Sequence, residues 1–149
     1  MAHILIVDDD RGVRVLLKSL LSSQGGHKTT ECESGAKALK LIEDSDFDLV
    51  ITDLRMSDVH GIALLEVVKK LSPSTPVILV TAYCSPESTE EAVILGAFDY
   101  IAKPFKIDDL LSVIRRALGA GGGKSRALDG YAGNNQVILD YLAKNTLSP

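Results

Sequence analysis

Five strand-like runs alternate with five amphipathic helical patterns in the first 118 residues, and this order constrains the fold more than any other feature of the sequence. Three of the runs, ILIV, LVIT and PVILVT, are apolar throughout, whereas a half-exposed strand would be apolar only at every second residue. Strands buried on both faces are typical of parallel sheets that helices cover on both sides. The sequence therefore predicts an α/β fold with a doubly wound, five-stranded parallel sheet. We expect the strands at residues 4–7, 28–32, 49–52, 76–81 and 99–102.

The helices between these strands are indicated by apolar residues at helical spacing and by start and stop signals. Asp10 stands at the N-cap position of the first helix, which the glycines of QGGH at residues 24–27 should end. Pro86 stands at the first position of the fourth helix, where its missing N–H costs nothing. We expect the later helices over residues 34–43, 61–71, 85–97 and 107–118.

The composition limits the classes of function open to the chain. Its 149 residues suit one domain with a short tail, and no apolar run approaches the ~20 residues that span a membrane. The sequence opens without a signal-peptide pattern, so we expect a soluble, cytoplasmic protein with no membrane partner. A net charge of -4 and 5% aromatic residues argue against direct binding of nucleic acid. Any contact with DNA would therefore need an output domain that is absent here.

Residues 119–149 are expected to lie outside the domain formed by residues 1–118. The stretch GAGGGKS resembles a phosphate-binding loop, but it follows a helix rather than a strand and lacks the first glycine of that motif. We interpret it as a Gly-rich linker. Beyond it, the spacing of Val137, Ile138 and Tyr141 indicates a short helix, which could begin a missing output domain.

Chemically useful residues stand at the ends of four of the five predicted strands. In strand order they are Asp8, Asp9 and Asp10 after the first strand, Asp53 after the third, Thr81 and Ala82 at the fourth, and Lys103 after the fifth. The carboxyl ends of parallel strands meet at one edge of the sheet, where ligands of such folds bind. We therefore expect these side chains to converge on one site.

Carboxylates grouped without histidine or thiolate form a hard-oxygen site, for which Mg²⁺ is the natural cation. Asp10 is better interpreted as a helix cap than as a ligand, whereas Asp8 and Asp9 come too early in the chain to cap the helix and are better interpreted as metal ligands. A lysine and a threonine hydroxyl beside the cation could stabilise the charge of a phosphoryl group during its transfer. One carboxylate would then remain as the nucleophile.

Four segments, ILIVDDD, LVITDLRM, VILVTAY and GAFDYIAKPF, resemble the receiver domain of two-component response regulators over roughly residues 3–118. The stretch EEAVILGAFDYIAKPF is similar to receivers of NtrC-type enhancer-binding transcription activators. The resemblance implies a flavodoxin-like sheet with strand order 2-1-3-4-5. It also implies a phosphoacceptor at Asp53 and Mg²⁺ held by Asp9, Asp53 and the backbone carbonyl of Arg55, with Asp8 acting mainly through water.

The resemblance assigns roles to further residues around this site. Thr81 and the backbone N–H of Ala82 would contact the phosphoryl group, and Lys103 would pair with it. Tyr100 would change rotamer together with Thr81 as a switch, and Arg55 and Tyr83 would set the lifetime of the phosphoryl group. Receivers of this type usually hold the bond between Lys103 and Pro104 in the cis form.

At the level of function, the resemblance implies a signalling switch rather than an enzyme, one that catalyses only its own phosphotransfer and dephosphorylation. A sensor histidine kinase would supply the phosphoryl group. The surface of the fourth helix, fifth strand and fifth helix would then change its affinity for an output domain or partner, or for a second copy in a dimer. The output would be regulation of transcription.

Other functions fit parts of the pattern. Asp8 and Asp10 also satisfy the Asp-x-Asp motif of haloacid-dehalogenase-like phosphatases, as nucleophile and acid/base, although Gly12 departs from that motif. A flavodoxin-like flavin module fits poorly, because three aspartates would repel a flavin phosphate. A degenerate receiver that works without phosphorylation is a further alternative. The loop RMSDVHG after Asp53 lacks the proline usual in receivers, but this change removes no phosphoryl ligand.

Overall fold

A computed structural model of the chain describes residues 2–56, 61–82 and 85–119. Strands and helices alternate along it without exception. The strands are β1 (His3–Val7), β2 (Lys28–Cys32), β3 (Leu49–Thr52), β4 (Val77–Thr81) and β5 (Asp99–Ala102). The helices are α1 (Arg11–Gly25), α2 (Gly35–Asp44), α3 (Gly61–Leu71), α4 (Pro86–Ile94) and α5 (Ile107–Gly119).

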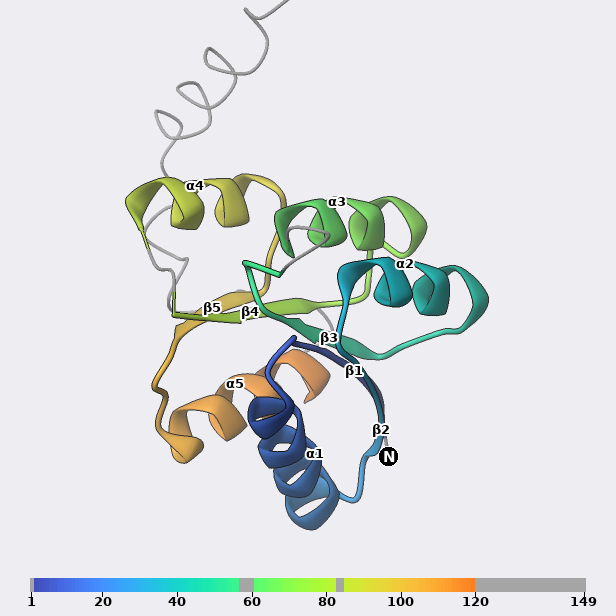
Figure 1. Cartoon of the computed structure of the whole chain (residues 1–149), viewed down its shortest axis with the longest axis vertical. Helices are drawn as coiled ribbons and strands as arrows, with labels where there is room; N and C mark the ends of the chain where they lie inside the picture. The colour runs from blue at the N-terminus through green and yellow to red at the C-terminus, as the bar shows by residue number, and fades with distance from the viewer. Residues whose placement is uncertain (1, 57–60, 83–84, 120–149) are drawn as a thin grey trace, which may run out of the picture.

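The five strands form one parallel sheet in the order β2-β1-β3-β4-β5, which confirms the predicted fold class and strand order. Helices α1 and α5 cover one face of the sheet, and α2, α3 and α4 cover the other (Figure 1). The order of the strands reverses between β1 and β3, because the chain moves outward from β1 to β2 and then returns past β1 to β3. In sheets of this kind, a ligand site is expected beyond the carboxyl ends of the strands at this reversal.

Two hydrophobic cores lie on opposite faces of the sheet, because successive strand residues point to opposite sides. On β1, Ile4 and Ile6 pack with α1 and α5, whereas Leu5 and Val7 pack on the side of α2 and α3. The central strands β1, β3 and β4 are buried along almost their whole length, which explains why their sequences are apolar throughout. This double burial holds the carboxyl ends of the strands in a fixed relation to one another.

The predicted helix boundaries are confirmed where the sequence carries a cap. The Asp10 carboxylate accepts hydrogen bonds from the N–H groups of Gly12 and Val13 at the start of α1, and Gly26 ends this helix with a left-handed φ of 61°. Helix α4 begins at Pro86 as expected but ends at Ile94, three residues before the predicted end. The reason is a turn at Gly96, where φ is 89° and the N–H donates to the carbonyl of Val93.

Several sequence-based predictions concern residues outside those that the structure describes, namely the loop at 57–60, Tyr83, and the linker and short helix beyond residue 119. The peptide bond between Lys103 and Pro104 is cis, as the resemblance implied. No helix among the described residues combines the length and the apolar character that crossing a membrane requires.

Candidate functional site

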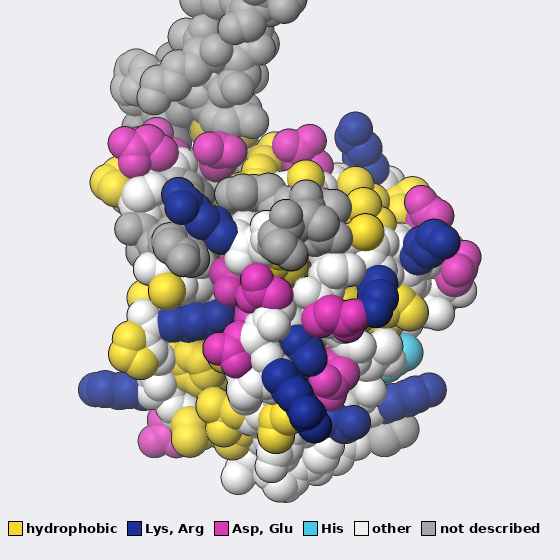
Figure 2. Space-filling view, in the orientation of Figure 1, with side chains coloured by type: hydrophobic (Ala, Val, Ile, Leu, Met, Phe, Trp, Pro, Cys, Tyr) yellow, Lys and Arg dark blue, Asp and Glu magenta, His cyan; other side chains and the backbone are white. Residues whose placement is uncertain are grey.

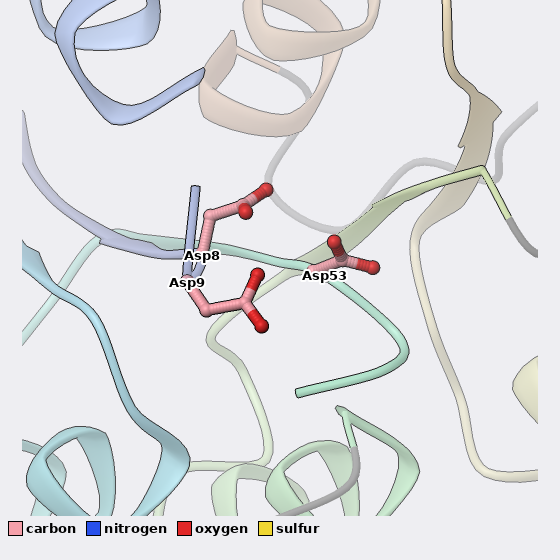
Figure 3. A group of neighbouring side chains, drawn as sticks. All are labelled: Asp8, Asp9 and Asp53. Atoms are coloured by element: carbon pink, nitrogen blue, oxygen red, sulfur yellow. The ribbon is translucent and has the colours of Figure 1, made fainter. Parts of the chain in front are cut away.

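The register of the sheet brings the acidic residues of two strands side by side. Val7 at the end of β1 pairs with Thr52 at the end of β3, so the next residues, Asp8 and Asp53, emerge together from adjacent strands. The N–H of Asp53 donates to the carbonyl of Val7 over 3.0 Å and fixes this arrangement. The carboxylates of Asp8, Asp9 and Asp53 each offer an oxygen within 4.8 Å of the others (Figure 3).

Lys103 reaches the same point from β5. Thr81 pairs with Ala102, and the N–H of Lys103 donates to the carbonyl of Thr81 over 2.8 Å, so the lysine lies just beyond the end of β4. Its Nζ donates to Asp8 Oδ2 over 2.7 Å and to Asp53 Oδ2 over 2.9 Å. One ammonium group therefore bridges two carboxylates that are almost fully buried.

The pKa values follow from this burial and pairing. Burial raises the pKa of Asp8, while the hydrogen bonds from Lys103 and from the N–H of Asp10 oppose the shift. Burial by itself lowers the pKa of Lys103, but its hydrogen bonds to Asp8 and Asp53 outweigh it and raise the pKa above the ordinary value. Lys103 therefore remains protonated and positively charged at neutral pH.

A cavity of about 430 Å³ opens over these groups and contains most of the residues predicted for the site. Its predicted lining residues are Asp8, Asp9, Asp53, Arg55, Ala82 and Lys103. Figure 2 shows acidic side chains gathered near the middle of this face, with lysine and arginine side chains around them. The cavity thus combines carboxylate oxygens with a cationic wall, which suits a divalent cation and a phosphoryl group together.

Thr81 and Tyr100 are placed differently from the carboxylates. Thr81 is fully buried at the end of β4, directly before Ala82, an exposed residue that lines the cavity. Tyr100 is half-buried in β5, and its side chain packs against the core on the side of α2, α3 and α4. The two residues lie on neighbouring strands, because Tyr100 pairs with Leu79 two residues before Thr81.

Sequence reasoning missed two residues near this site, Met56 and Arg14. Met56 lines the cavity, as does Asp10, which was expected there and also caps α1. Arg14 donates from Nη1 to the backbone carbonyl of Asp8 over 2.7 Å. The signal that could have found Arg14 is its position one turn into the helix that follows the three aspartates, where a positive charge opposes the helix dipole and needs a local partner.

Comparisons with a family model, with curated relatives and with solved structures all point to one family. The family model of the response regulator receiver domain matches residues 4–115. The chain is 41% identical over 115 residues to the transcriptional regulatory protein ZraR of Escherichia coli K12, which covers 77% of this chain and 26% of that protein. It is 37% identical over 113 residues to the DNA-binding transcriptional regulator NtrC of the same organism, covering 76% of this chain and 24% of that protein.

The chain thus spans about a quarter of the length of these relatives. Among solved structures, the response regulator protein TrrA of Thermotoga maritima, in complex with Mg²⁺-BeF, superposes with a TM-score of 0.72 at 32% identity. The match covers 79% of this chain and 100% of that one. Since the family match includes β1 to β5 and every described site residue, the chain belongs to the response regulator receiver domain family.

Proposed function

We propose that this chain is the phosphoacceptor receiver of a two-component signalling system and that Asp53 takes a phosphoryl group from a sensor histidine kinase. The observation that carries the proposal is the position of the Asp53 carboxylate. It faces the oxygens of Asp8 and Asp9 within one cavity and accepts a hydrogen bond from Lys103. The Asp53 Oδ1 also accepts a hydrogen bond from the N–H of Arg55 over 3.2 Å, which helps to orient the carboxylate.

The donor set fits Mg²⁺, because the clustered ligand atoms are all carboxylate oxygens and Mg²⁺ prefers one or two carboxylates with water. Asp9, Asp53 and the backbone carbonyl of Arg55 would hold the cation, with Asp8 contributing mainly through water. The cation would offset the repulsion between the carboxylates and neutralise charge on the transferred phosphoryl group.

The transfer itself would use residues of this chain. An Asp53 oxygen forms the new bond to phosphorus, the bond between phosphorus and the imidazole nitrogen of the kinase breaks, and the imidazole keeps the electron pair. Lys103, the Thr81 hydroxyl and the Ala82 N–H would receive the charged phosphoryl oxygens. Hydrolysis later returns Asp53 to a carboxylate, and we propose that Arg55 and Tyr83 restrict the attacking water, so that the phosphoryl group lasts for minutes or longer.

The signal would leave the site through Thr81 and Tyr100. When Thr81 moves toward the phosphoryl group, Tyr100 would change rotamer, and the surface of α4, β5 and α5 would change its affinity for a partner. That partner could be a second copy of the chain or an output domain. Since ZraR and NtrC are transcription regulators, we propose transcription regulation as the output, with residues 1–118 as the receiver and residues 119–149 as the connection to the output domain.

The experiment that tests this proposal is intact-mass spectrometry after exposure to acetyl phosphate, with and without Mg²⁺. The wild-type chain should gain one phosphoryl group only when Mg²⁺ is present, and Asp53→Asn should gain none. Asp109→Asn is the matched control, because Asp109 is an exposed aspartate in the first turn of α5 and should leave phosphorylation unchanged. Peptide mapping of an adduct on Asp8 would instead support the phosphatase chemistry, and a wild-type chain that stays unmodified would contradict phosphotransfer altogether.

A further inference from the structure

Arg14 occupies an unusual position for a basic residue. It is the fourth residue of α1, whose positive dipole end disfavours a second positive charge nearby. Yet the side chain is not directed into solvent, since only 12% of it is exposed. Its placement therefore requires partners that compensate for both the dipole and the burial.

One of those partners directly follows β1 and the other lies on β2. Nη1 of Arg14 donates to the backbone carbonyl of Asp8 over 2.7 Å, and Nε donates to Glu31 Oε1 on β2 over 3.1 Å. Glu31 pairs in register with Ile6 of β1, two residues before Asp8. One guanidinium group thus ties the end of β1 to the neighbouring strand and to the start of α1.

The bond to the Asp8 carbonyl completes the anchoring of this residue. The Asp8 N–H donates to the carbonyl of Cys32 over 3.2 Å, Oδ1 accepts from the N–H of Asp10 over 2.9 Å, and Oδ2 accepts from Lys103. Without Arg14, the peptide that links Asp8 to Asp9 loses the one side-chain contact described for its carbonyl. That peptide joins Asp8 and Asp9, the two members of the carboxylate cluster that follow β1.

We propose that Arg14 is a positioning residue for the Mg²⁺ site: by bridging the Asp8 carbonyl and the Glu31 carboxylate, it fixes the Asp8–Asp9 peptide so that the carboxylates of Asp8 and Asp9 face Asp53. This inference rests on the proposed function, since it assumes that the carboxylates bind the cation. Arg14 itself would not touch the cation. Groups that orient metal ligands without touching the metal commonly change the affinity for the metal by 10- to 100-fold when they are removed.

Lys18 offers an internal comparison. It lies one turn further along α1, carries the same charge and approaches the same glutamate, with its Nζ 3.9 Å from Glu31 Oε2. It is 57% exposed, and the described contacts connect it to Glu31 rather than to Asp8. If Arg14 acted only through its positive charge, Lys18 would have a similar effect on Mg²⁺ binding. If Arg14 acts through its hydrogen bond to the Asp8 carbonyl, Lys18 should have little effect.

The test is isothermal titration calorimetry of the full chain with MgCl₂, in the wild type, Arg14→Gln and Lys18→Gln. We expect the Kd for Mg²⁺ to rise by at least about 10-fold in Arg14→Gln and by less than about twofold in Lys18→Gln, because an exposed charge is largely screened. Equal Kd values in the wild type and Arg14→Gln, or equal changes in the two variants, would overturn the proposal.

A second variant guards against loss of folding in Arg14→Gln. Arg14→Lys keeps the charge but not the planar fork that reaches both Asp8 and Glu31, so its Kd should also rise, whereas a wild-type Kd would overturn the proposal. Thermal unfolding in the absence of Mg²⁺ shows whether each variant is folded at the temperature of the titration. The Kd for Mg²⁺ should rise in Arg14→Gln and Arg14→Lys even where the variant is fully folded. If the wild-type chain itself binds no Mg²⁺, the proposed function fails; if only the Arg14 effect is missing, this inference alone fails.

Discussion

At the scale of single residues, the site is a balance between three carboxylates and one ammonium group. Asp8 and Asp53 are buried, and Lys103 contacts both of them, so each carboxylate depends on the same positive charge. Buried ion pairs add little net stability when intact, but removal of one partner leaves an uncompensated charge in a medium that solvates it poorly. Lys103 therefore stabilises the folded site in the absence of a phosphoryl group.

We predict that Lys103→Met lowers the free energy of unfolding by about 3 kcal/mol near neutral pH. This loss in the free energy of unfolding should become smaller as the pH falls toward about 4, where the carboxyl groups become protonated. The pKa of Asp8 is already raised above its ordinary value of 3.8 by burial, and without Lys103 it rises further. A carboxyl group whose pKa is higher in the folded chain than in the unfolded chain lowers the stability as the pH rises from the unfolded pKa through the folded pKa. At a pH below both pKa values the group is protonated in the folded and the unfolded chain, and the loss of stability disappears.

Urea denaturation of both proteins at neutral and acidic pH, without Mg²⁺, measures this effect. Lys106→Met is the control, because Lys106 is an exposed lysine three residues further along the chain and should change the stability little at either pH. A loss in Lys103→Met that is independent of pH would show that the lysine contributes through packing rather than through its charge.

At the scale of elements, the connection from β3 to α3 controls where Asp53 lies. The N–H of Gly61 at the start of α3 donates to the carbonyl of Leu54 over 2.7 Å, so the helix begins directly against the end of β3. A Cβ atom at Gly61 would lie 2.2 Å from the Asp53 carbonyl oxygen and 2.8 Å from the Leu54 Cα. Both neighbours are backbone atoms, so only a glycine lets α3 approach the end of β3 this closely.

Gly61→Ala should therefore destabilise the chain by about 2 kcal/mol, because backbone must move to accept the methyl group. It should also slow phosphorylation by acetyl phosphate, since the segment that must shift includes Asp53. Gly119→Ala at the end of α5 is the matched change, because a Cβ there meets nothing within 4 Å. Urea denaturation and the rate of appearance of the phosphoryl adduct measure the two effects, and equal behaviour of the two variants would refute the steric argument.

At the scale of the whole molecule, the sheet holds the site at one edge while helices seal both faces. The residues that touch the cavity come from the ends of β1, β3, β4 and β5, so they are close together only when all four strands are paired. A cation bound to these carboxylates would therefore bind the folded chain in preference to the unfolded chain. Such binding must stabilise the fold as a whole.

We predict that Mg²⁺ at about 100 times its Kd raises the free energy of unfolding by about 2.7 kcal/mol. Removal of Mg²⁺ with a chelator should abolish the gain, and Asp9→Asn should reduce it strongly, because Asp9 is the exposed member of the carboxylate cluster and the one most open to the cation. Urea denaturation with and without Mg²⁺ at constant ionic strength measures this gain. A gain that persists unchanged in Asp9→Asn would indicate general screening of charge rather than binding at the site.

Much of this protein could be predicted from its sequence because local physics determines the relevant features. The apolar runs at β1, β3 and β4 could be buried only on both faces, which required a parallel sheet with helices on both sides. Asp10, Pro86 and the glycine at residue 26 act on their own neighbours, so the boundaries that they set were predicted correctly. The end of α4 was predicted wrongly, because apolar residues continue at helical spacing past the turn at Gly96.

The sequence by itself determined which side chains stand at the strand ends, since that depends only on where each apolar run stops. The tertiary structure alone decided how they meet. The pairing of Val7 with Thr52 places Asp8 beside Asp53, and Lys103 bridges the two carboxylates only because β5 pairs with β4. Arg14 on α1 likewise reaches Glu31 on β2, 17 residues further along the chain. Contacts between residues this far apart in the chain depend on strand register and side-chain packing, and no local pattern of residues specifies either.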